Sequence, residues 1–246
     1  MTEPRSGIPW RDATVRHVSH PVPRAVQLRL EVPDRPEHLP GQHYVVRLTA
    51  EDGYRASRSY SLASTAADPL VELFVERLDD GEVSPYLADE VRTGDHLEVR
   101  GPIGRWFTWS GETPALAVGG GTGVVPLVAM LRHSIEIGRP DLLRVAAFAG
   151  SPEELPYAGE LSAAGALLGF SRDRRGLEAL AGPRLSAARD RPTGRVRGED
   201  LEALLAGGQT AYVCGSASFA ESATSLLVTL GVAPEQIRVE RFGPTG

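Results

Sequence analysis

The sequence is poor in two residue types on which many active sites depend, cysteine and lysine. It contains a single cysteine, Cys214, and every one of its 26 Lys and Arg residues is arginine. One thiol excludes intrachain disulfides, a cysteine-ligated zinc site and an iron–sulfur cluster held by this chain alone. The absence of lysine excludes a Walker-type phosphate loop and Schiff-base chemistry. Any electron chemistry in this chain therefore needs another cofactor.

Long apolar runs and a strong excess of positive charge are also missing. No run approaches the ~20 residues of a membrane span, and the first residues, Met1 to Arg5, lack the apolar core of a signal peptide. The formal net charge of −6 gives no reason to expect binding to nucleic acid or to an anionic membrane. The six histidines show no metal-ligand spacing, so no metal site is expected. The default expectation is a cytoplasmic protein.

The first half of the chain has the pattern of an all-β domain. From Asp12 to Arg100, apolar and polar residues alternate, and turn signals such as Thr93-Gly94-Asp95 separate the runs. About six short strands at this spacing predict an antiparallel barrel or sandwich. A short helix is expected at Ser84 to Glu90, with Ser84 as its N-cap and Pro85 at its first position.

The second half has the pattern of a parallel sheet with crossover helices, because strand-like and helical runs alternate from Pro114 onward. The expected strands after the first are Leu143–Ala149, Arg184–Ala188, Thr210–Cys214 and Ile237–Arg241, and the expected helices include Glu199–Leu205 and Ala217–Leu230. The segment Ser162–Gly182 suggests no clear element. The change of pattern near Ser110 predicts two domains, residues 1–110 and 111–246.

A glycine-rich turn in the middle of the chain is a candidate phosphate site. The apolar run Ala115–Val118 enters Gly119–Gly123, and Pro126 follows in the first turn of an expected helix. Such a strand, turn and helix aim unpaired backbone N–H groups and the positive end of a helix at one spot, which suits a pyrophosphate. The glycines would let a ligand approach the backbone. A tight turn that binds nothing is the alternative, because Pro126 replaces the third glycine of the common dinucleotide fingerprint.

A second candidate site lies in an expected barrel strand. Strand alternation places Arg58 and Tyr60 on one face, and Ser59 and Ser61 on the other. Arg58 could pair with a phosphate, Tyr60 could lie against a planar ring, and Ser61 could donate a hydrogen bond to that ring. A surface arginine beside a tyrosine that packs in the barrel is the alternative.

Motifs in a fixed order resemble the ferredoxin–NADP(+) reductase superfamily over nearly the whole chain. They are Pro40-Gly41-Gln42-His43, Arg58-Ser59-Tyr60-Ser61, Gly81-Glu82-Val83-Ser84, Gly101-Pro102-Ile103-Gly104, Gly120 to Pro126, Cys214-Gly215-Ser216-x-x-Phe219 and Glu240-Arg241-Phe242. The resemblance implies an antiparallel Greek-key β-barrel that binds FAD, followed by a doubly wound parallel α/β sheet that binds NAD(P)H.

The resemblance also implies roles for the residues of the FAD-binding motifs. Arg58 and Ser84 would hold the FAD pyrophosphate. Tyr60 would pack on the isoalloxazine, and Ser61 would hydrogen-bond near its reactive nitrogen. The remaining cofactor-binding candidates in these motifs are Ser59, Gly81 and Val83.

In the α/β domain, the resemblance assigns the dinucleotide pyrophosphate to Gly121, Thr122 and Gly123. Cys214 and Gly215 would lie near the nicotinamide, with Glu240 as a nearby polar group. Phe242 matches a terminal aromatic residue that in some family members shields the flavin. The candidate catalytic residues are therefore Ser61, Cys214, Glu240 and Phe242.

Arginine clusters favour NADP over NAD, because a basic residue is needed to meet the 2′-phosphate. Arg189 and Arg191 follow the expected strand Arg184–Ala188, and Ser171-Arg172 is a competing pair. NAD remains possible, since surface arginines would explain both clusters.

The resemblance implies an FAD-dependent NAD(P)H oxidoreductase. It would take a hydride from NAD(P)H onto FAD and pass electrons to a separate acceptor, such as a ferredoxin or an oxygenase. A separate acceptor is expected because one cysteine cannot hold an iron–sulfur cluster. The alternatives are an NAD(P)H-dependent reductase of free flavin and a non-catalytic flavin- or nucleotide-binding module.

Overall fold

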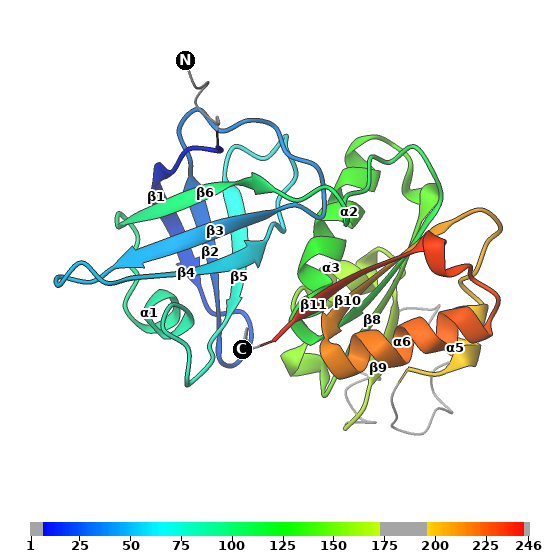
Figure 1. The fold of residues 1–246 in the computed structure, drawn as a ribbon. Helices are drawn as coiled ribbons and strands as arrows, with labels where there is room; N and C mark the ends of the chain where they lie inside the picture. Colours follow the sequence, from blue (N-terminus) through cyan, green and yellow to red (C-terminus); the bar gives the residue numbers. More distant parts are fainter. Residues whose placement is uncertain (1–6, 173–195, 244–246) are drawn as a thin grey trace, which may run out of the picture. The chain divides into compact units, whose positions relative to one another are not determined.

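The computed structural model describes residues 7–172 and 196–243, and the chain divides into two compact units, Met1–Arg105 and Trp106–Gly246 (Figure 1). This division lies slightly before the boundary expected at Ser110. The reason is that Phe107 and Trp109 are buried in the core of the second unit, where the Trp109 indole Nε1 donates to the Thr113 carbonyl at 2.9 Å.

The first unit is an antiparallel sheet that curls into a barrel. Its strands, in the order β4-β3-β6-β1-β2-β5, are β1 (Arg11–Ser19), β2 (Ala25–Glu31), β3 (His43–Thr49), β4 (Arg55–Ser61), β5 (Val71–Glu76) and β6 (His96–Ile103). A bridge between Leu62 and Leu73 joins the end of β4 to β5, and the Ala63 amide donates to the Glu72 carbonyl at 3.0 Å. The two outer strands of the sheet therefore meet, so the unit is a barrel, one of the two architectures that the strand pattern predicts.

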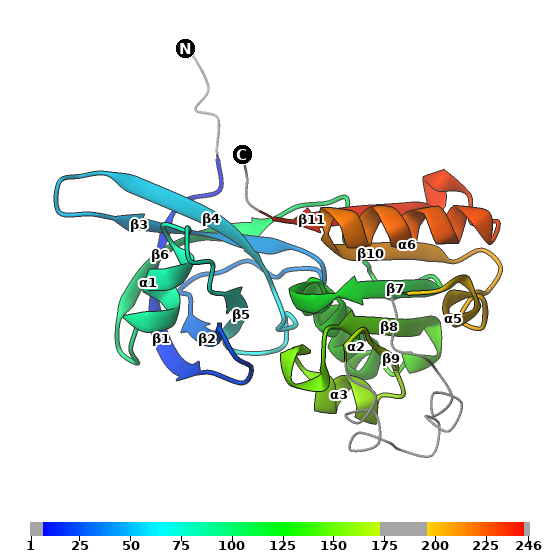
Figure 2. The same cartoon turned by 90° about the horizontal axis from the view of Figure 1, so that it is seen from below.

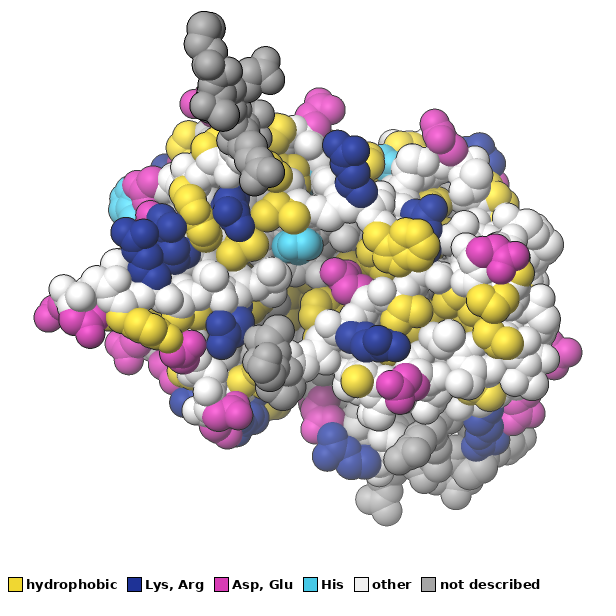
Figure 3. Space-filling view, viewed as in Figure 1, with side chains coloured by type: hydrophobic (Ala, Val, Ile, Leu, Met, Phe, Trp, Pro, Cys, Tyr) yellow, Lys and Arg dark blue, Asp and Glu magenta, His cyan; other side chains and the backbone are white. Residues whose placement is uncertain are grey.

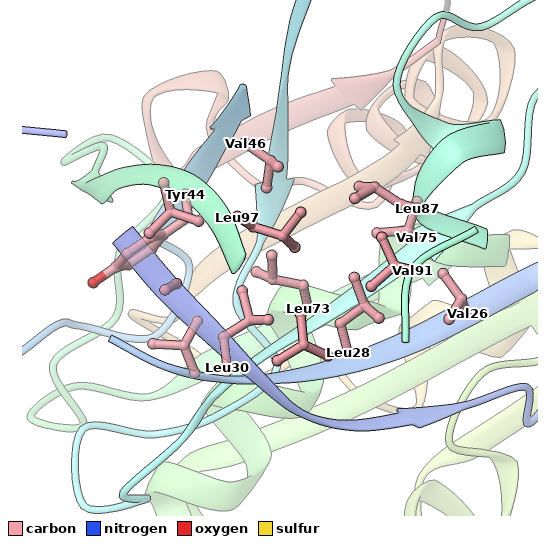
Figure 4. Close-up of a cluster of buried hydrophobic side chains, with 14 of the residues drawn as sticks. Val26, Leu28, Leu30, Tyr44, Val46, Leu73, Val75, Leu87, Val91 and Leu97 are labelled. Atoms are coloured by element: carbon pink, nitrogen blue, oxygen red, sulfur yellow. The ribbon is translucent and has the colours of Figure 1, made fainter. Parts of the chain in front are cut away.

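The interior of the barrel is filled by the alternate side chains of its strands (Figure 4). Leu28, Leu30 and Val46 are fully buried there, and each is two residues from another buried residue of its strand. The helix α1 (Ser84–Asp89) adds Leu87 to the same core. The period of two in the sequence thus reports the buried face of strands such as β2 and β3, whereas β5 is buried on both faces.

The second unit is a five-stranded parallel sheet with helices on both faces (Figures 1 and 2). Its order is β11-β10-β7-β8-β9, with β7 (Ala115–Gly120), β8 (Leu143–Ala149), β9 (Leu167–Phe170), β10 (Thr210–Ser216) and β11 (Ile237–Phe242). The helices α2 (Val125–Glu136) and α3 (Ala158–Ala163) pack on one face, and α5 (Gly198–Glu202) and α6 (Ala217–Thr229) pack on the other. This confirms the doubly wound fold class.

The segment that suggested no clear element contributes the edge strand β9. It is short, and its Gly169 is required by packing, because a Cβ there would lie 2.6 Å from the Phe148 ring. The strand expected at Arg184–Ala188 lies outside the described residues. The helix expected at Glu199–Leu205 is shorter than predicted, since α5 ends at Glu202.

The surface carries acidic and basic side chains interspersed with one another on the face shown in Figure 3. None of the described helices is long and apolar enough to cross a membrane. Within residues 7–172 and 196–243, no three His, Cys, Asp or Glu side chains form a group that could hold a metal ion.

Candidate FAD and dinucleotide sites

Two hydroxyl groups at the end of β4 are buried without a hydrogen-bond partner among the described residues. They are Tyr60 Oη and Ser61 Oγ. Burial raises the pKa of Tyr60, so its hydroxyl stays protonated and can donate. An unsatisfied buried polar group costs about 1–3 kcal/mol, and such groups mark places that water or a ligand completes. The Ser61 hydroxyl thus has a hydrogen bond to offer a flavin, whereas the Tyr60 ring packs partly against the barrel core, as the alternative interpretation expects, and the flavin roles of both residues stay predictions.

Arg58, two residues before Tyr60 on β4, has a carboxylate neighbour. Its Nη1 donates to the Ser57 carbonyl at 2.8 Å, and its Nη2 lies 3.5 Å from Glu82 Oε2. Glu82 Oε1 also accepts a hydrogen bond from Tyr54 Oη at 2.6 Å. Ser59, between Arg58 and Tyr60, is exposed. The motif Arg58-Ser59-Tyr60-Ser61 does not reveal the contact with Glu82, because Glu82 lies in the loop before α1.

Ser84 stabilises the loop before α1 through a hydrogen bond to its side chain. It is not the N-cap that the sequence suggests. The helix begins at Ser84 and its N-cap is Val83, because the Ser84 hydroxyl instead accepts from the Leu78 amide at 3.1 Å. A Cβ on Gly81 would lie 2.8 Å from Ser84 Oγ, so glycine is needed there. Val83 is fully buried in the barrel core. The Ser84 hydroxyl still has its own hydrogen to donate to a phosphate.

The glycine-rich turn follows β7 as one turn of 3-10 helix, η1 (Gly121–Val124), and Pro126 stands in the first turn of α2, as expected. A Cβ on Gly123 would lie 2.3 Å from the Cys214 carbonyl oxygen, and one on Gly120 would lie 2.6 Å from the Phe219 ring. Only Gly121 faces open space, and its φ of +57° is one that glycine adopts readily. Packing against Phe219 therefore requires glycine at position 120, and packing against β10 requires it at position 123, while the assignment of Gly121, Thr122 and Gly123 to a pyrophosphate stays a prediction.

The turn lies where the order of the sheet reverses. From β7 the chain leads to β8 on one side, and from β10 it leads to β11 on the other. Ligands of open α/β sheets bind at the carboxyl ends of strands at such a point. In the strand register Gly119 is beside Cys214, and Cys214 is beside Glu240. Sheet topology thus gathers the predicted dinucleotide site from three strands that are far apart in the sequence.

Cys214 and Glu240 are both held toward their neutral forms. Burial, followed by the charge of Glu240, raises the pKa of the Cys214 thiol well above its usual range, so it is no thiolate nucleophile. Burial also raises the pKa of Glu240 to about 7, and its Oε2 has no partner in the part of the chain that the structure describes. Phe242 is half-buried against the same core as Cys214. Gly215 closely approaches Phe219, whose ring would lie 2.8 Å from a Cβ there.

Of the two candidate arginine clusters for a 2′-phosphate, one can be located. Arg172 follows β9, and its amide donates to the Gly150 carbonyl at 2.8 Å after β8. Its guanidinium Nη2 is 2.5 Å from Glu154 Oε2. Arg189 and Arg191 lie outside the described residues.

Comparisons with known proteins agree with this arrangement. Residues 13–108 match the family described as the oxidoreductase FAD-binding domain. The chain is 28% identical over 221 residues, 89% of its length, to the ferredoxin–NAD(P)(+) reductase component of naphthalene 1,2-dioxygenase/salicylate 5-hydroxylase systems from Ralstonia sp, and it spans 65% of that relative.

Solved structures share the fold. The FAD/NAD-binding domain of nitric oxide dioxygenase from Vibrio cholerae superposes with a TM-score of 0.77 at 24% identity, covering 95% of this chain and 99% of that one. A ferredoxin NADP+ reductase from Neisseria gonorrhoeae with bound FAD and NADP superposes with a TM-score of 0.74 at 18% identity, covering 94% and 98%.

The barrel matches an FAD-binding domain family, and the doubly wound sheet that follows it has the architecture of a dinucleotide-binding domain. The chain thus resembles the ferredoxin–NADP(+) reductases in the sequence of its barrel and shares the fold of their solved structures.

Proposed function

We propose that this chain takes electrons from NADPH through FAD and passes them to a separate acceptor protein, a ferredoxin or the oxygenase that it serves. The name of the Ralstonia relative, a reductase component of dioxygenase and hydroxylase systems, supports this class of acceptor. When bound, FAD supplies the step between a two-electron donor and a one-electron acceptor. The single cysteine supports an acceptor outside this chain, since an iron–sulfur cluster needs several ligands.

The observation that carries the proposal is the pair of buried hydroxyls at the end of β4. Tyr60 Oη and Ser61 Oγ are donors without partners in the described chain. A flavin offers both an aromatic face for the Tyr60 ring and acceptor atoms for the Ser61 hydroxyl. Arg58, on the same strand, supplies a permanent positive charge for the pyrophosphate, because a guanidinium does not lose its proton in proteins.

The carboxyl ends of β10 and β11 would hold the nicotinamide. In this role Cys214 supplies a small, neutral wall, and Glu240 supplies a hydrogen-bonding group for the carboxamide. With a pKa of about 7, Glu240 can either donate or accept at neutral pH. The task of these residues is orientation and exclusion of water.

We assign the preference for NADPH to the arginines of the two candidate clusters, and among the described residues to Arg172, which follows β9. Arg172→Gln should lower kcat/KM for NADPH at least about tenfold, the loss expected for one charge-assisted contact, and leave kcat/KM for NADH nearly unchanged. Measuring both donors on the same variant controls for damage to the fold. Equal losses with the two donors would contradict this assignment.

An absorbance spectrum and an anaerobic titration test the central claim. The purified protein, alone or after addition of FAD, should show a flavin spectrum that bleaches on addition of NADPH. Bound FAD that NADPH and NADH both fail to bleach would indicate a non-catalytic module. A protein that takes up no FAD would contradict the proposal.

The acceptor is tested by reduction of cytochrome c with and without added ferredoxin. Activity that depends on ferredoxin supports the proposal, whereas strong activity without it counts against a ferredoxin acceptor. Turnover that instead rises with added free flavin, in a protein that loses its flavin on purification, would favour a reductase of diffusible flavin.

A further inference from the structure

The arginine proposed to hold the FAD pyrophosphate already has an anionic neighbour. Glu82 Oε2 lies 3.5 Å from Arg58 Nη2, and the two side chains are about half exposed, at 48% and 42%. Arg58 Nη1 is used by the Ser57 carbonyl at 2.8 Å. Arg58 Nη2, one of the donors that remain for a phosphate, therefore faces Glu82.

The Glu82 side chain is held in its position beside Arg58, because its other carboxylate oxygen accepts a hydrogen bond. Tyr54 Oη donates to Glu82 Oε1 at 2.6 Å, and Tyr54 belongs to the turn that connects β3 to β4. Two loops thus fix the carboxylate in front of the arginine. Ser84, the second predicted phosphate ligand, follows Glu82 by two residues, and its Oγ would lie 2.8 Å from a Cβ on Gly81.

The charge of this group is opposite to what a pyrophosphate site needs. Two phosphates bring negative charge to one guanidinium, and a carboxylate within a few ångströms repels them. An arginine without a carboxylate beside it would bind the phosphates more tightly.

We propose that Glu82 is a competitor for the FAD pyrophosphate on Arg58, which weakens FAD binding and makes the flavin exchangeable. This inference rests on the proposed function, since it takes FAD as the ligand of Arg58. The carboxylate leaves Arg58 when the phosphates arrive, and it returns when they leave. The effect acts on the phosphates alone and does not reach the isoalloxazine ring.

The test is the dissociation constant of FAD, measured by flavin fluorescence on the full chain after removal of flavin, for the wild type and for Glu82→Gln. Glutamine keeps the shape and the hydrogen bond to Tyr54 but removes the charge. The variant should bind FAD roughly threefold to tenfold more tightly at low salt, with a smaller gain at high salt, because exposed charges are screened. Riboflavin, which lacks phosphate, should bind equally to both proteins.

Asp80→Asn is the matched control. Asp80 is an exposed residue of the same loop, so the substitution removes one negative charge nearby without touching the Arg58 contact. It should leave the FAD dissociation constant nearly unchanged. An equal gain in Asp80→Asn, an equal gain for riboflavin, or no gain in Glu82→Gln would each overturn the inference while leaving the proposed function in place. A wild-type protein that binds no FAD would instead remove the proposed function and this inference together.

Discussion

The two units build their sites by different means. In the barrel, the candidate site consists of side chains that are neighbours in the sequence, with Arg58, Tyr60 and Ser61 on one strand. In the α/β unit, it consists partly of glycines against which other parts of the protein pack closely. Its other members are Cys214 and Glu240, which lie side by side on adjacent strands. In the barrel, each side chain of the candidate site can be replaced without disturbing the fold. In the α/β unit, the candidate residues are held in place by the packing of the fold itself. Substitutions should therefore affect binding in the first unit and folding or titration in the second.

The largest effect is expected at Gly123. Alanine there would place its Cβ 2.3 Å from the Cys214 carbonyl oxygen, which is backbone and cannot move without moving β10. Gly123→Ala should lower the free energy of unfolding by more than about 3 kcal/mol. Denaturant unfolding measures this. The control is Gly121→Ala, which meets no atom within 4 Å and should cost only about 1–2 kcal/mol for its positive φ. Equal losses would contradict the packing explanation.

The next effect is on FAD affinity, at Arg58. Arg58→Gln should weaken FAD binding about tenfold to a hundredfold, the loss expected for one charge-assisted hydrogen-bonding group. The half-exposed position predicts little change in the free energy of unfolding, within about 0.5 kcal/mol. Fluorescence titration with FAD and denaturant unfolding measure the two quantities on the same protein. Unchanged FAD affinity would show that Arg58 is not the phosphate ligand.

An effect on the pH dependence of stability is expected from the titration of Glu240. Its pKa in the folded protein, about 7, exceeds the ordinary value of 4.5. Between these values the folded protein keeps a proton that the unfolded chain has released, so stability falls as pH rises through this window and stays lower above it. Glu240→Gln should remove the fall and be more stable than the wild type at pH 8 by up to about 3 kcal/mol, with little difference near pH 4.

Urea unfolding across this pH range measures the Glu240 effect. Glu235→Gln, at an exposed position just before β11, is the control and should follow the wild type at every pH. A Glu240→Gln profile parallel to that of the wild type would mean that Glu240 does not titrate near neutrality.

The smallest effect is expected at Tyr60. Tyr60→Phe removes a buried hydroxyl that lacks a partner, so it should leave the free energy of unfolding unchanged or raise it by less than about 1 kcal/mol. FAD binding should weaken about threefold, through the lost hydrogen bond. Tyr44→Phe makes a matched comparison, because Tyr44 is the register partner of Tyr60 and its hydroxyl also lacks a partner within the described residues. A similar loss of FAD affinity in Tyr44→Phe would refute a specific role for Tyr60.

The sequence predicted most where the relevant signal is local. The alternation of apolar and polar residues indicated the strands of the barrel, and the apolar run from Ala115 to Val118 indicated β7. It failed where a contact decides the outcome. Serine is a common N-cap residue, but the hydroxyl of Ser84 accepts a hydrogen bond from the Leu78 amide instead of capping the helix. The strand β9 is four residues long and includes Gly169, whose role depends on the Phe148 ring.

The candidate site divides in the same way. The direction of Arg58 and Tyr60 follows from strand geometry, and the resemblance supplies their roles. The neighbourhood of Cys214 and Glu240 cannot be derived from spacing, since it depends on the order of strands in the sheet. The carboxylate in front of Arg58 had no signal at all, because a loop contact between Glu82 and β4 leaves no pattern in the sequence.

The glycine-rich turn has a practical meaning for protein engineering. At Gly119, Gly120 and Gly123 an added Cβ would meet protein atoms within 3 Å, whereas at Gly121 it would meet none within 4 Å. A library that randomised the whole turn would therefore consist mostly of chains that cannot fold. One restricted to position 121, with residues that tolerate a positive φ such as asparagine or aspartate, would vary the side chain at the proposed dinucleotide site while leaving the packing of the turn intact.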